Sequence, residues 1–247
     1  MRTLYFDCFS GISGDMTIGA LLDLGGDAAR LKTELAKLNI ETEYELKWEK
    51  VVKKGVSATK FDVILTNHQE DHHHHHDHHR HYSDIVEMIT GADLNENVTK
   101  MALSIFEKIG RAEAKIHNMP FEKVHFHEVG AVDSIVDIVG TCILLDALDI
   151  SQIAASPVPV GNGRIRIAHG LYPVPAPATL EVLKGIPIQQ TDIKGELTTP
   201  TGAGILSALV HEFGSLPSCT AEAIGYGAGT KDFPDHPNVL RVILGTA

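Results

Sequence analysis

The first third of the chain alternates between short apolar runs and apolar residues at helical spacing. Leu4–Phe6 predicts a strand, and the glycine- and serine-rich segment Asp7–Gly14 predicts a turn leading into a helix over about Asp15–Leu24. A second helix before the polar break at Asn39 is indicated by three leucines at helical spacing, Leu31, Leu35 and Leu38. The chain is therefore expected to begin as strand, loop and two helices.

An antiparallel hairpin is predicted next, followed by an interruption of the fold. Tyr44–Trp48 alternates apolar and charged residues, Val56–Leu65 has the composition of a strand, and Lys53–Gly55 supplies the turn between them. Residues 67–82 contain almost nothing that could enter a core, so we expect a flexible, disordered, histidine-rich loop there.

Helical patterns dominate the rest of the chain. Ser83 and Asp84 indicate a helix start, and the apolar positions within Val98–Ile116 trace one face of a long amphipathic helix. Ala131–Leu148 is apolar on nearly every side, which predicts a helix buried against several neighbours. The remaining predicted elements are a short helix ending near Gly185, a helix starting at Thr199–Pro200 and a final strand Val239–Leu244.

These elements predict an α/β (mixed α+β) fold: a mixed sheet with packed helices, one β-hairpin and the disordered loop. With 43% hydrophobic and 21% charged residues, the 247-residue chain has a globular composition, and we expect one domain over residues 1–247. No apolar run approaches the roughly 20 residues that span a bilayer, and Met1–Tyr5 leads straight into a strand. A cytoplasmic protein without a membrane partner is expected.

Charge and cysteine content exclude further classes. The formal net charge of −11 argues against nucleic acid, which is bound by Lys and Arg, and favours cations as partners. Cys8, Cys142 and Cys219 lie far apart and form no CxxC pair, so we expect buried thiols and neither disulfides nor a thiolate zinc site. The unusual feature is 15 histidines, most of them in one short stretch.

That histidine tract is the first candidate metal site. Neutral imidazole suits nickel, copper and zinc, and interspersed carboxylates add oxygen ligands. Because a flexible loop imposes no geometry, affinity should follow the Irving–Williams order, and nickel specificity has to arise elsewhere. An expression tag or a solvated loop is the alternative, although the internal position and the interruptions at Asp77 and Arg80 argue against a tag. The candidate ligands are His72, His73, His74, His75, His76, His78, His79 and His81.

A second cluster precedes and enters the predicted buried helix. If its first residues are extended, His125 and His127 face the same side, and Glu128 lies close to the helix start. Asp133 and Asp137, four residues apart, share one face of the otherwise apolar helix. The cluster predicts either a divalent-metal site or a base positioned by a carboxylate. The alternative is that Asp133 and Asp137 cap turns or face solvent and that the histidines pack against the helix start.

The glycine loop after the first strand is a third candidate. Gly11, Ser13 and Gly14 offer backbone N–H groups at a helix start, which favours phosphate, but the lysine of a P-loop is absent. Asp7 and Asp15 are candidate metal ligands, and Asp15 has the alternative of capping the helix.

Later loops form a fourth group. Arg164 could pair with a phosphate or carboxylate, and Thr199 and Thr201 offer hydroxyl and N–H groups at a helix start. Turns and caps are the alternative role for all three residues.

Five motifs, in order along the chain, resemble those of one family, the nickel insertion proteins of lactate racemase cofactor biosynthesis. The resemblance covers the chain from Met1 to the final strand. The motifs are Leu4–Met16, the histidine tract, His125–Asp137, Pro173–Thr179 and Gly225–Gly229.

The resemblance implies a lyase-type nickel chelatase (cyclometallase). Such an enzyme places Ni(II) into pyridinium bisthiocarboxylic acid mononucleotide, forms nickel–sulfur and nickel–carbon bonds and consumes CTP with Mg or Mn. It also implies a C-terminal nucleotide-binding domain beyond this chain, needed for full activity, and lactate racemase-type apoenzymes as recipients. The oligomeric state stays open between a monomer and a homo-oligomer.

Combining that chemistry with the residues gives a hypothesis for the site. The tract collects nickel and passes it to a structured site around His125, His127, Glu128 and Asp133. There His127 or Glu128 removes the proton from the substrate ring carbon that will bond to nickel. The substrate phosphate would lie on the glycine loop or against Arg164. A non-enzymatic nickel store or chaperone is the main alternative, and a metal-dependent phosphohydrolase is disfavoured because neither an HD pair nor a DxD motif is present.

Overall fold

The computed structural model describes residues 2–66, 80–124, 126, 129, 131–167 and 170–246. The predicted loop at 67–82 therefore lies outside the described residues except for its last three positions. Within the described ranges, the fold is mixed α/β, as predicted, and no helix combines the length and apolar character needed to cross a membrane.

A seven-stranded mixed sheet forms the framework, in the order β11-β4-β1-β13-β12-β3-β2. Its parallel pairs are β1–β4, β4–β11 and β12–β3, and its antiparallel pairs are β1–β13, β12–β13 and β2–β3. The strands are β1 (Arg2–Asp7), β2 (Tyr44–Lys53), β3 (Val56–Leu65), β4 (Gln152–Ala155), β11 (Glu212–Phe213), β12 (Thr220–Ala228) and β13 (Val239–Thr246).

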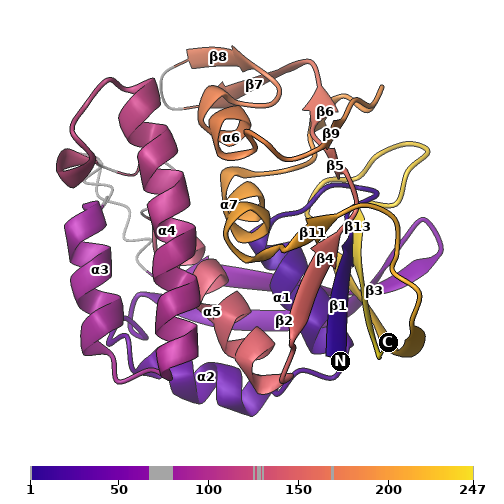
Figure 1. The fold of residues 1–247 in the computed structure, drawn as a ribbon, viewed down its shortest axis with the longest axis horizontal. Coiled ribbons are helices and arrows are strands. Elements are labelled where there is room, and N and C mark those ends of the chain that lie inside the picture. The colour runs from indigo at the N-terminus through magenta and orange to yellow at the C-terminus, as the bar shows by residue number, and fades with distance from the viewer. Residues whose placement is uncertain are drawn as a thin grey trace.

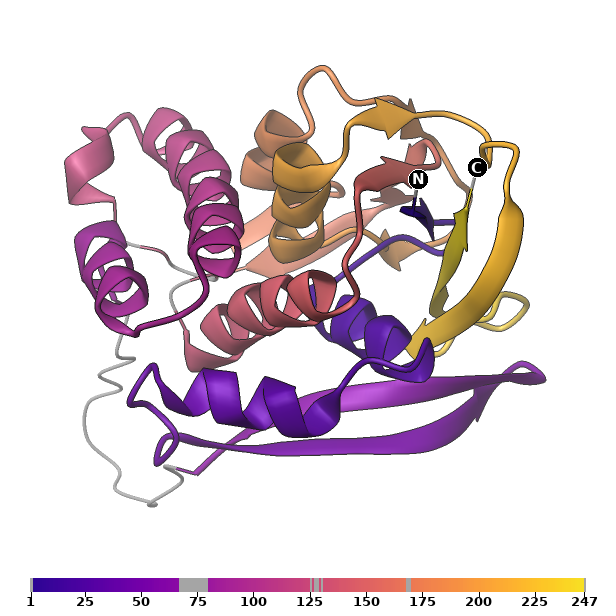
Figure 2. The ribbon, with the colours of Figure 1, turned by 60° about the horizontal axis from the view of Figure 1, so that its bottom comes forward.

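The helices gather on one side of this framework (Figures 1 and 2). Helix α1 lies innermost, packed against the sheet and against α5, while α3 and α4 lie at the end of the molecule away from the two chain termini. The helices are α1 (Gly14–Asp23), α2 (Ala28–Ala36), α3 (Tyr82–Gly91), α4 (Glu96–Ile116), α5 (Val132–Ala147), α6 (Pro177–Val182) and α7 (Pro200–Leu209).

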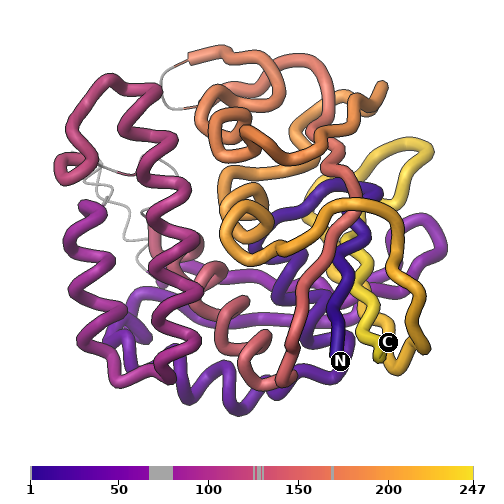
Figure 3. The backbone as a smooth tube through the Cα atoms, in the orientation of Figure 1, coloured from indigo at the N-terminus to yellow at the C-terminus, as the bar shows by residue number. Residues whose placement is uncertain are grey.

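Three small two-stranded sheets occupy the segment between α5 and α7, seen as the orange part of the tube in Figure 3. None of them joins the main sheet. They pair β5 (Val158–Pro159) with β9 (Ile188–Gln189), β6 (Gly161–Asn162) with β10 (Gly195–Glu196), and β7 (Arg164–Ile167) with β8 (Gly170–Pro173).

Several sequence predictions are confirmed. The hairpin β2–β3 turns at Lys54 and Gly55, whose φ angles of 48° and 84° are those of a tight hairpin turn. Helix α5 is buried along almost its whole length, and α4 buries one apolar face. Helix α7 begins as predicted, because the Thr199 hydroxyl accepts the Gly202 N–H at 3.2 Å.

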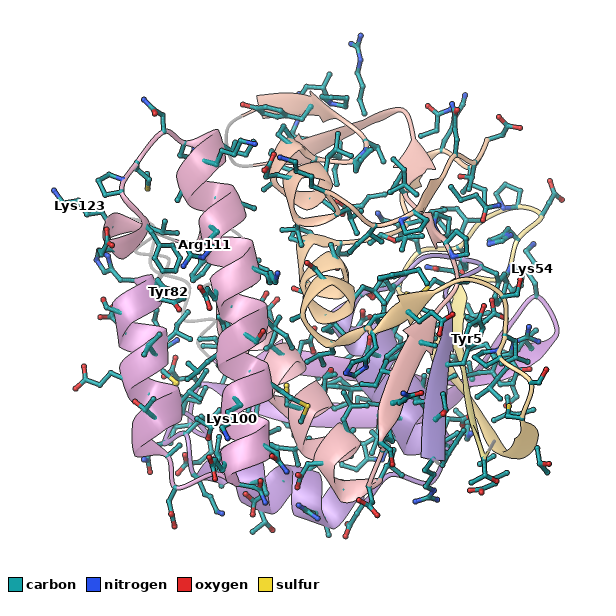
Figure 4. All side chains as sticks on the ribbon, in the orientation of Figure 1. Tyr5, Lys54, Tyr82, Lys100, Arg111 and Lys123 are labelled. Atoms are coloured by element: carbon teal, nitrogen blue, oxygen red, sulfur yellow. The ribbon has the colours of Figure 1, made fainter. Side chains whose placement is uncertain are left out.

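The packing of α3 on α4 depends on an aromatic group around the short 3-10 helix Phe121–Lys123 (η1). The Tyr82 and Phe121 rings lie 4.4 Å apart, and the Arg111 guanidinium lies 4.9 Å from the Phe121 ring centroid. Figure 4 shows Tyr82 and Arg111 facing each other from the two helices. The helix start predicted at Ser83–Asp84 is therefore held by tertiary contacts at Tyr82, one residue earlier.

Strands β4 and β12 were not predicted from sequence. The four residues of β4 are too few for a period, and β12 carries Gly225 and Gly227 on the face that meets α1, where a strand would ordinarily show apolar side chains. A Cβ on Gly227 would lie well inside van der Waals contact with the Met16 carbonyl oxygen, and one on Gly225 would overlap the Ala20 carbonyl oxygen. The motif Gly225–Gly229 thus allows the α1 backbone to rest directly on β12.

We expect Gly227→Ala to lower the free energy of unfolding by at least about 2 kcal/mol, because the added methyl forces α1 away from β12. Urea titration followed by circular dichroism measures the change. The control is Gly91→Ala, at the end of α3, where an added Cβ meets nothing within 4 Å. Equal stability of the two variants would contradict the close packing of α1 on β12.

Candidate functional site

A cavity of about 360 Å³ lies where the first turns of three helices meet. Helices α1, α5 and α7 each contribute residues from their N-terminal ends, and β3 closes one side. Unpaired N–H groups give helix N-termini a partial positive charge, so three of them favour a negatively charged ligand. The polar residues lining the cavity are Ser13, Asp15, Lys60, Asp62, Asp133, Ser134, Asp137, Glu196, Thr199, Thr201 and Thr230.

Backbone contacts hold the starts of α1 and α7 together. The Thr199 N–H donates to the Ile12 carbonyl at 3.1 Å, and Ile12 forms a parallel bridge with Thr198. Gly202 fits against Ile12 only because it lacks a Cβ, which would overlap the Ile12 carbonyl oxygen. The glycine loop and the Thr199–Thr201 loop, 185 or more residues apart in sequence, therefore form one surface.

Asp137 joins α5 to the start of α1. Its side chain packs on Gly14, where an added Cβ would lie 2.5 Å from the Asp137 Cβ. The Asp15 backbone N–H donates to the Asp137 carboxylate, but Oδ1 is buried and has no hydrogen-bond partner among the described residues. Burial, with the neighbouring negative charges of Asp15 and Asp133, raises the pKa of Asp137 well above its ordinary value, and Lys60 only partly opposes this.

Lys60 is the positive centre of the site, and sequence reasoning missed it. Its Nζ lies 2.9 Å from Asp15 Oδ2, 2.7 Å from Asp62 Oδ1 and 2.8 Å from the Phe61 carbonyl oxygen. Burial disfavours the charge, but Asp15 and Asp62 outweigh it and raise the pKa of Lys60. The available signal was the pair Lys60 and Asp62, two residues apart and hence on one face of a predicted strand.

Six of the predicted site residues come together in this cavity: Ser13, Gly14, Asp15, Asp133, Thr199 and Thr201. Gly11 does not line the cavity, and its backbone, with φ of 85°, packs against the Leu197 backbone. Asp7 and Arg164 do not line the cavity. The Asp7 carboxylate pairs with Arg241 on β13, and Arg164 is exposed on β7.

Most of the predicted imidazole ligands lie outside the described residues. His81 is described and precedes α3, where its N–H donates to Asp84 at 3.0 Å. Val129, which is buried and lines the cavity, is the sequence neighbour of Glu128. The residues outside the described ranges are His72, His73, His74, His75, His76, His78, His79, His125, His127 and Glu128.

Preformed metal ligands are sparse in the part of the chain that the structure describes. No three His, Cys, Asp or Glu side chains there converge to hold a metal ion. Cys8 and Cys142 are fully buried, as predicted, and burial raises the pKa of both thiols. Cys219 is only half-buried, so the prediction of a buried thiol is wrong there. All three cysteines are free.

Comparison with known proteins identifies close relatives. The family model described as "Nickel insertion protein" matches residues 4–247. The chain is 59% identical over 247 residues to a pyridinium-3,5-bisthiocarboxylic acid mononucleotide nickel insertion protein of Geobacillus kaustophilus, covering 99% of this chain and 60% of the relative. A protein of the same name from Staphylococcus epidermidis is 51% identical over 244 residues, with 98% and 59% covered.

A putative nickel insertion protein of Geotalea daltonii is 51% identical over 246 residues, covering 99% of this chain and 61% of the relative. The chain thus spans about 60% of the length of the curated relatives it matches. No solved structure matches it.

The raised pKa of Asp137 gives stability a predicted pH dependence. At a pH between the ordinary aspartate pKa and the raised pKa of Asp137, we expect the native state to retain a proton that the unfolded chain has released. The resulting stabilisation is complete below the ordinary pKa and is lost as pH rises through the raised one. The side chain of the Asp137→Asn variant cannot ionise. We expect the free energy of unfolding of this variant, relative to that of the unaltered chain, to increase as the pH is raised from about 4 to about 8.

Urea unfolding at several pH values in that range measures the effect. The control is Asp149→Asn, because Asp149 is exposed beyond α5 and has a φ of 51° that asparagine tolerates. Parallel pH profiles for Asp137→Asn and the unaltered chain would show that the native state holds no such proton.

Proposed function

This chain belongs to the nickel insertion protein family, and we propose that it inserts Ni(II) into pyridinium-3,5-bisthiocarboxylic acid mononucleotide in a CTP-dependent cyclometallation. The enzyme is a lyase-type nickel chelatase, and this chain supplies the nickel-binding part of it. A C-terminal nucleotide-binding domain takes CTP with Mg or Mn and is needed for full activity. Matched relatives that extend well beyond the length of this chain support that division.

The cavity between the three helix starts is the observation that supports this proposal most directly. Helix N-termini attract a mononucleotide phosphate, and carboxylates attract a cation, so the cavity suits a phosphate-bearing substrate that binds together with a metal ion. Its volume of about 360 Å³ is in the usual range for small-molecule sites. Of the two phosphate positions considered, the glycine loop is favoured over Arg164, which lies outside the cavity.

The proposed roles follow from that position. His72–His81 collect nickel and deliver it to His125 and His127, and Asp15 at the α1 start is a further candidate ligand. Bond formation between nickel and the ring carbon requires the loss of the ring proton. His127 or Glu128 accepts this proton, and Asp133 is the third proposed catalytic residue. Ser13, Gly14, Thr199 and Thr201 bind the phosphate, and Gly11 shapes the loop. Asp7 is the least favoured of the candidate metal ligands, because its carboxylate already accepts a hydrogen bond from Arg241.

The cellular setting follows from the same reaction. The protein acts in the cytoplasm, and its partners are the thiocarboxylated mononucleotide, the C-terminal domain and lactate racemase-type apoenzymes that receive the finished cofactor.

A nickel store or chaperone is the second candidate, favoured by the histidine tract and the net charge of −11. The two functions differ in what they require of the cavity. A store keeps its capacity when cavity residues change, whereas an insertase loses turnover.

With CTP and the C-terminal part of the protein present, we expect the thiocarboxylated substrate and Ni(II) to give the nickel product. The change in absorbance on nickel insertion measures its formation. His127→Ala, Glu128→Gln and Asp133→Asn should each slow product formation about 100-fold, because positioned acid–base groups contribute roughly 10²–10⁴. Asp149→Asn, outside the cavity, is the matched control. If nickel binds but no product forms with any combination of CTP and the C-terminal part, the nickel store or chaperone would be the favoured function.

Replacing the seven histidines of residues 72–79 with asparagine should reduce the number of bound nickel ions and leave the urea unfolding transition unchanged. The replacement keeps the length and polarity of the segment, and it keeps His81, which precedes α3. Nickel binding is measured by equilibrium dialysis, with copper and zinc for comparison, since imidazole-rich segments follow the Irving–Williams order. If the number of nickel ions bound per protein is unchanged, the histidine tract does not collect nickel as proposed.

A further inference from the structure

The cavity poses an electrostatic problem for an anionic ligand. Five carboxylates and one ammonium group are among its described lining residues. In their ionised forms these acids repel the phosphate of a mononucleotide in the same cavity, and two unit charges about 4 Å apart near a protein surface interact by roughly 4 kcal/mol. Three helix N-termini offset this only in part, because each contributes roughly half an elementary charge. The acids are Asp15, Asp62, Asp133, Asp137 and Glu196.

Lys60 has no N–H donor left for Asp137, although its charge partly opposes the raised pKa of that group. An ammonium group has three N–H donors, and those of Lys60 are used by Asp15, Asp62 and the Phe61 carbonyl oxygen. The Asp137 Oδ1 is therefore left as a buried acceptor with no partner among the described residues. Asp137 as a whole remains partly exposed, because its side chain faces the cavity that it lines.

A buried carboxyl oxygen without a protein partner is satisfied by water, by an ion or by a donor on a ligand. A cation at this oxygen would also favour the ionised form of Asp137, whose pKa is raised in its absence. The described residues lining the cavity offer oxygen donors from carboxylates and hydroxyls, with no imidazole and no thiolate among them. Such a donor set suits hard cations such as Mg²⁺ and Mn²⁺, whereas nickel favours nitrogen and sulfur. Asp133 lies one helical turn before Asp137 on α5 and is exposed to the cavity.

We propose that the cavity binds a hard divalent cation, of the Mg²⁺ or Mn²⁺ type, between Asp133 and Asp137, and that this cation bridges α5 to the phosphate of the mononucleotide. The inference rests on the proposed function for the identity of the phosphate ligand. Mg²⁺ is commonly held by one or two carboxylates together with substrate phosphate and water. The bridge therefore does not require a group of three protein ligands, which is not found among the described residues.

This arrangement assigns two different metals to two positions. The hard cation stays on oxygen ligands and fixes the phosphate, while nickel is the ion transferred to the sulfur and carbon atoms of the ring. Because the phosphate is itself a ligand of the cation in this arrangement, binding of either one should raise the affinity of the protein for the other by the same factor.

Mn²⁺ titration followed by electron paramagnetic resonance tests the proposal, since the free aqueous ion gives a six-line signal that is lost on binding. The titration is made with and without nicotinic acid mononucleotide, a pyridinium mononucleotide that lacks thiocarboxylates. We expect the mononucleotide to tighten Mn²⁺ binding about tenfold, within the usual range of coupling. Asp137→Asn and Asp133→Asn should each abolish this tightening, and Asp149→Asn should retain it. Mn²⁺ also binds histidine weakly, so the tract contributes equally to all variants.

Unchanged coupling in both Asp133→Asn and Asp137→Asn would overturn the site. Because Asp133 is exposed, its variant keeps the test decisive even if Asp137→Asn fails to fold, which thermal unfolding would reveal. Failure of the proposed function is a separate outcome: Mn²⁺ coupling would persist while no nickel product forms. Nickel product without any Mn²⁺ coupling would leave the function standing and remove the bridge.

Discussion

The direct packing of the α1 backbone on the sheet is the constraint on which the rest of the molecule depends. Glycines on β12 and Gly19 on α1 remove the side chains that would separate helix from strands, so α1 rests against β12 and β3. The Asp23 carboxylate reinforces the far end of the helix by accepting the Tyr226 N–H and the Thr59 hydroxyl, each at 2.9 Å. The start of α1 is thereby held at one point, to which α5 and α7 are joined.

The site follows from that geometry. Gly14 at the start of α1 leaves room for Asp137 of α5, and Gly202 of α7 leaves room for the Ile12 carbonyl. Three helix starts meet because small residues occur where the backbones cross. The same convergence gathers carboxylates from α1, β3 and α5 around Lys60, so an electropositive backbone surface and an electronegative side-chain surface face one cavity. A site of this kind suits a ligand pair of opposite charge better than either ion alone.

The sequence was most informative where a pattern is local. Periodicity predicted α4, α5 and the β2–β3 hairpin, and capping chemistry predicted the start of α7 at Thr199. It was least informative where the packing partner determines the residue. Gly225 and Gly227 look like a loop motif but lie in the second half of strand β12, because the α1 backbone packs where side chains would otherwise lie. Lys60 was missed for a related reason, since a lysine in a strand ordinarily faces solvent.

The sequence by itself determined the mixed α/β class, the main helices, the acidic charge and the chemistry of the candidate groups, because these depend on composition and on spacing within single elements. Only the tertiary structure decided which candidates share a site. It separated Asp7 and Arg164 from the cavity and joined Ser13, Asp15, Asp133 and Thr199 with the unpredicted Lys60. Those contacts link residues up to 186 positions apart in the chain, and proximity over such separations depends on how helices and strands pack.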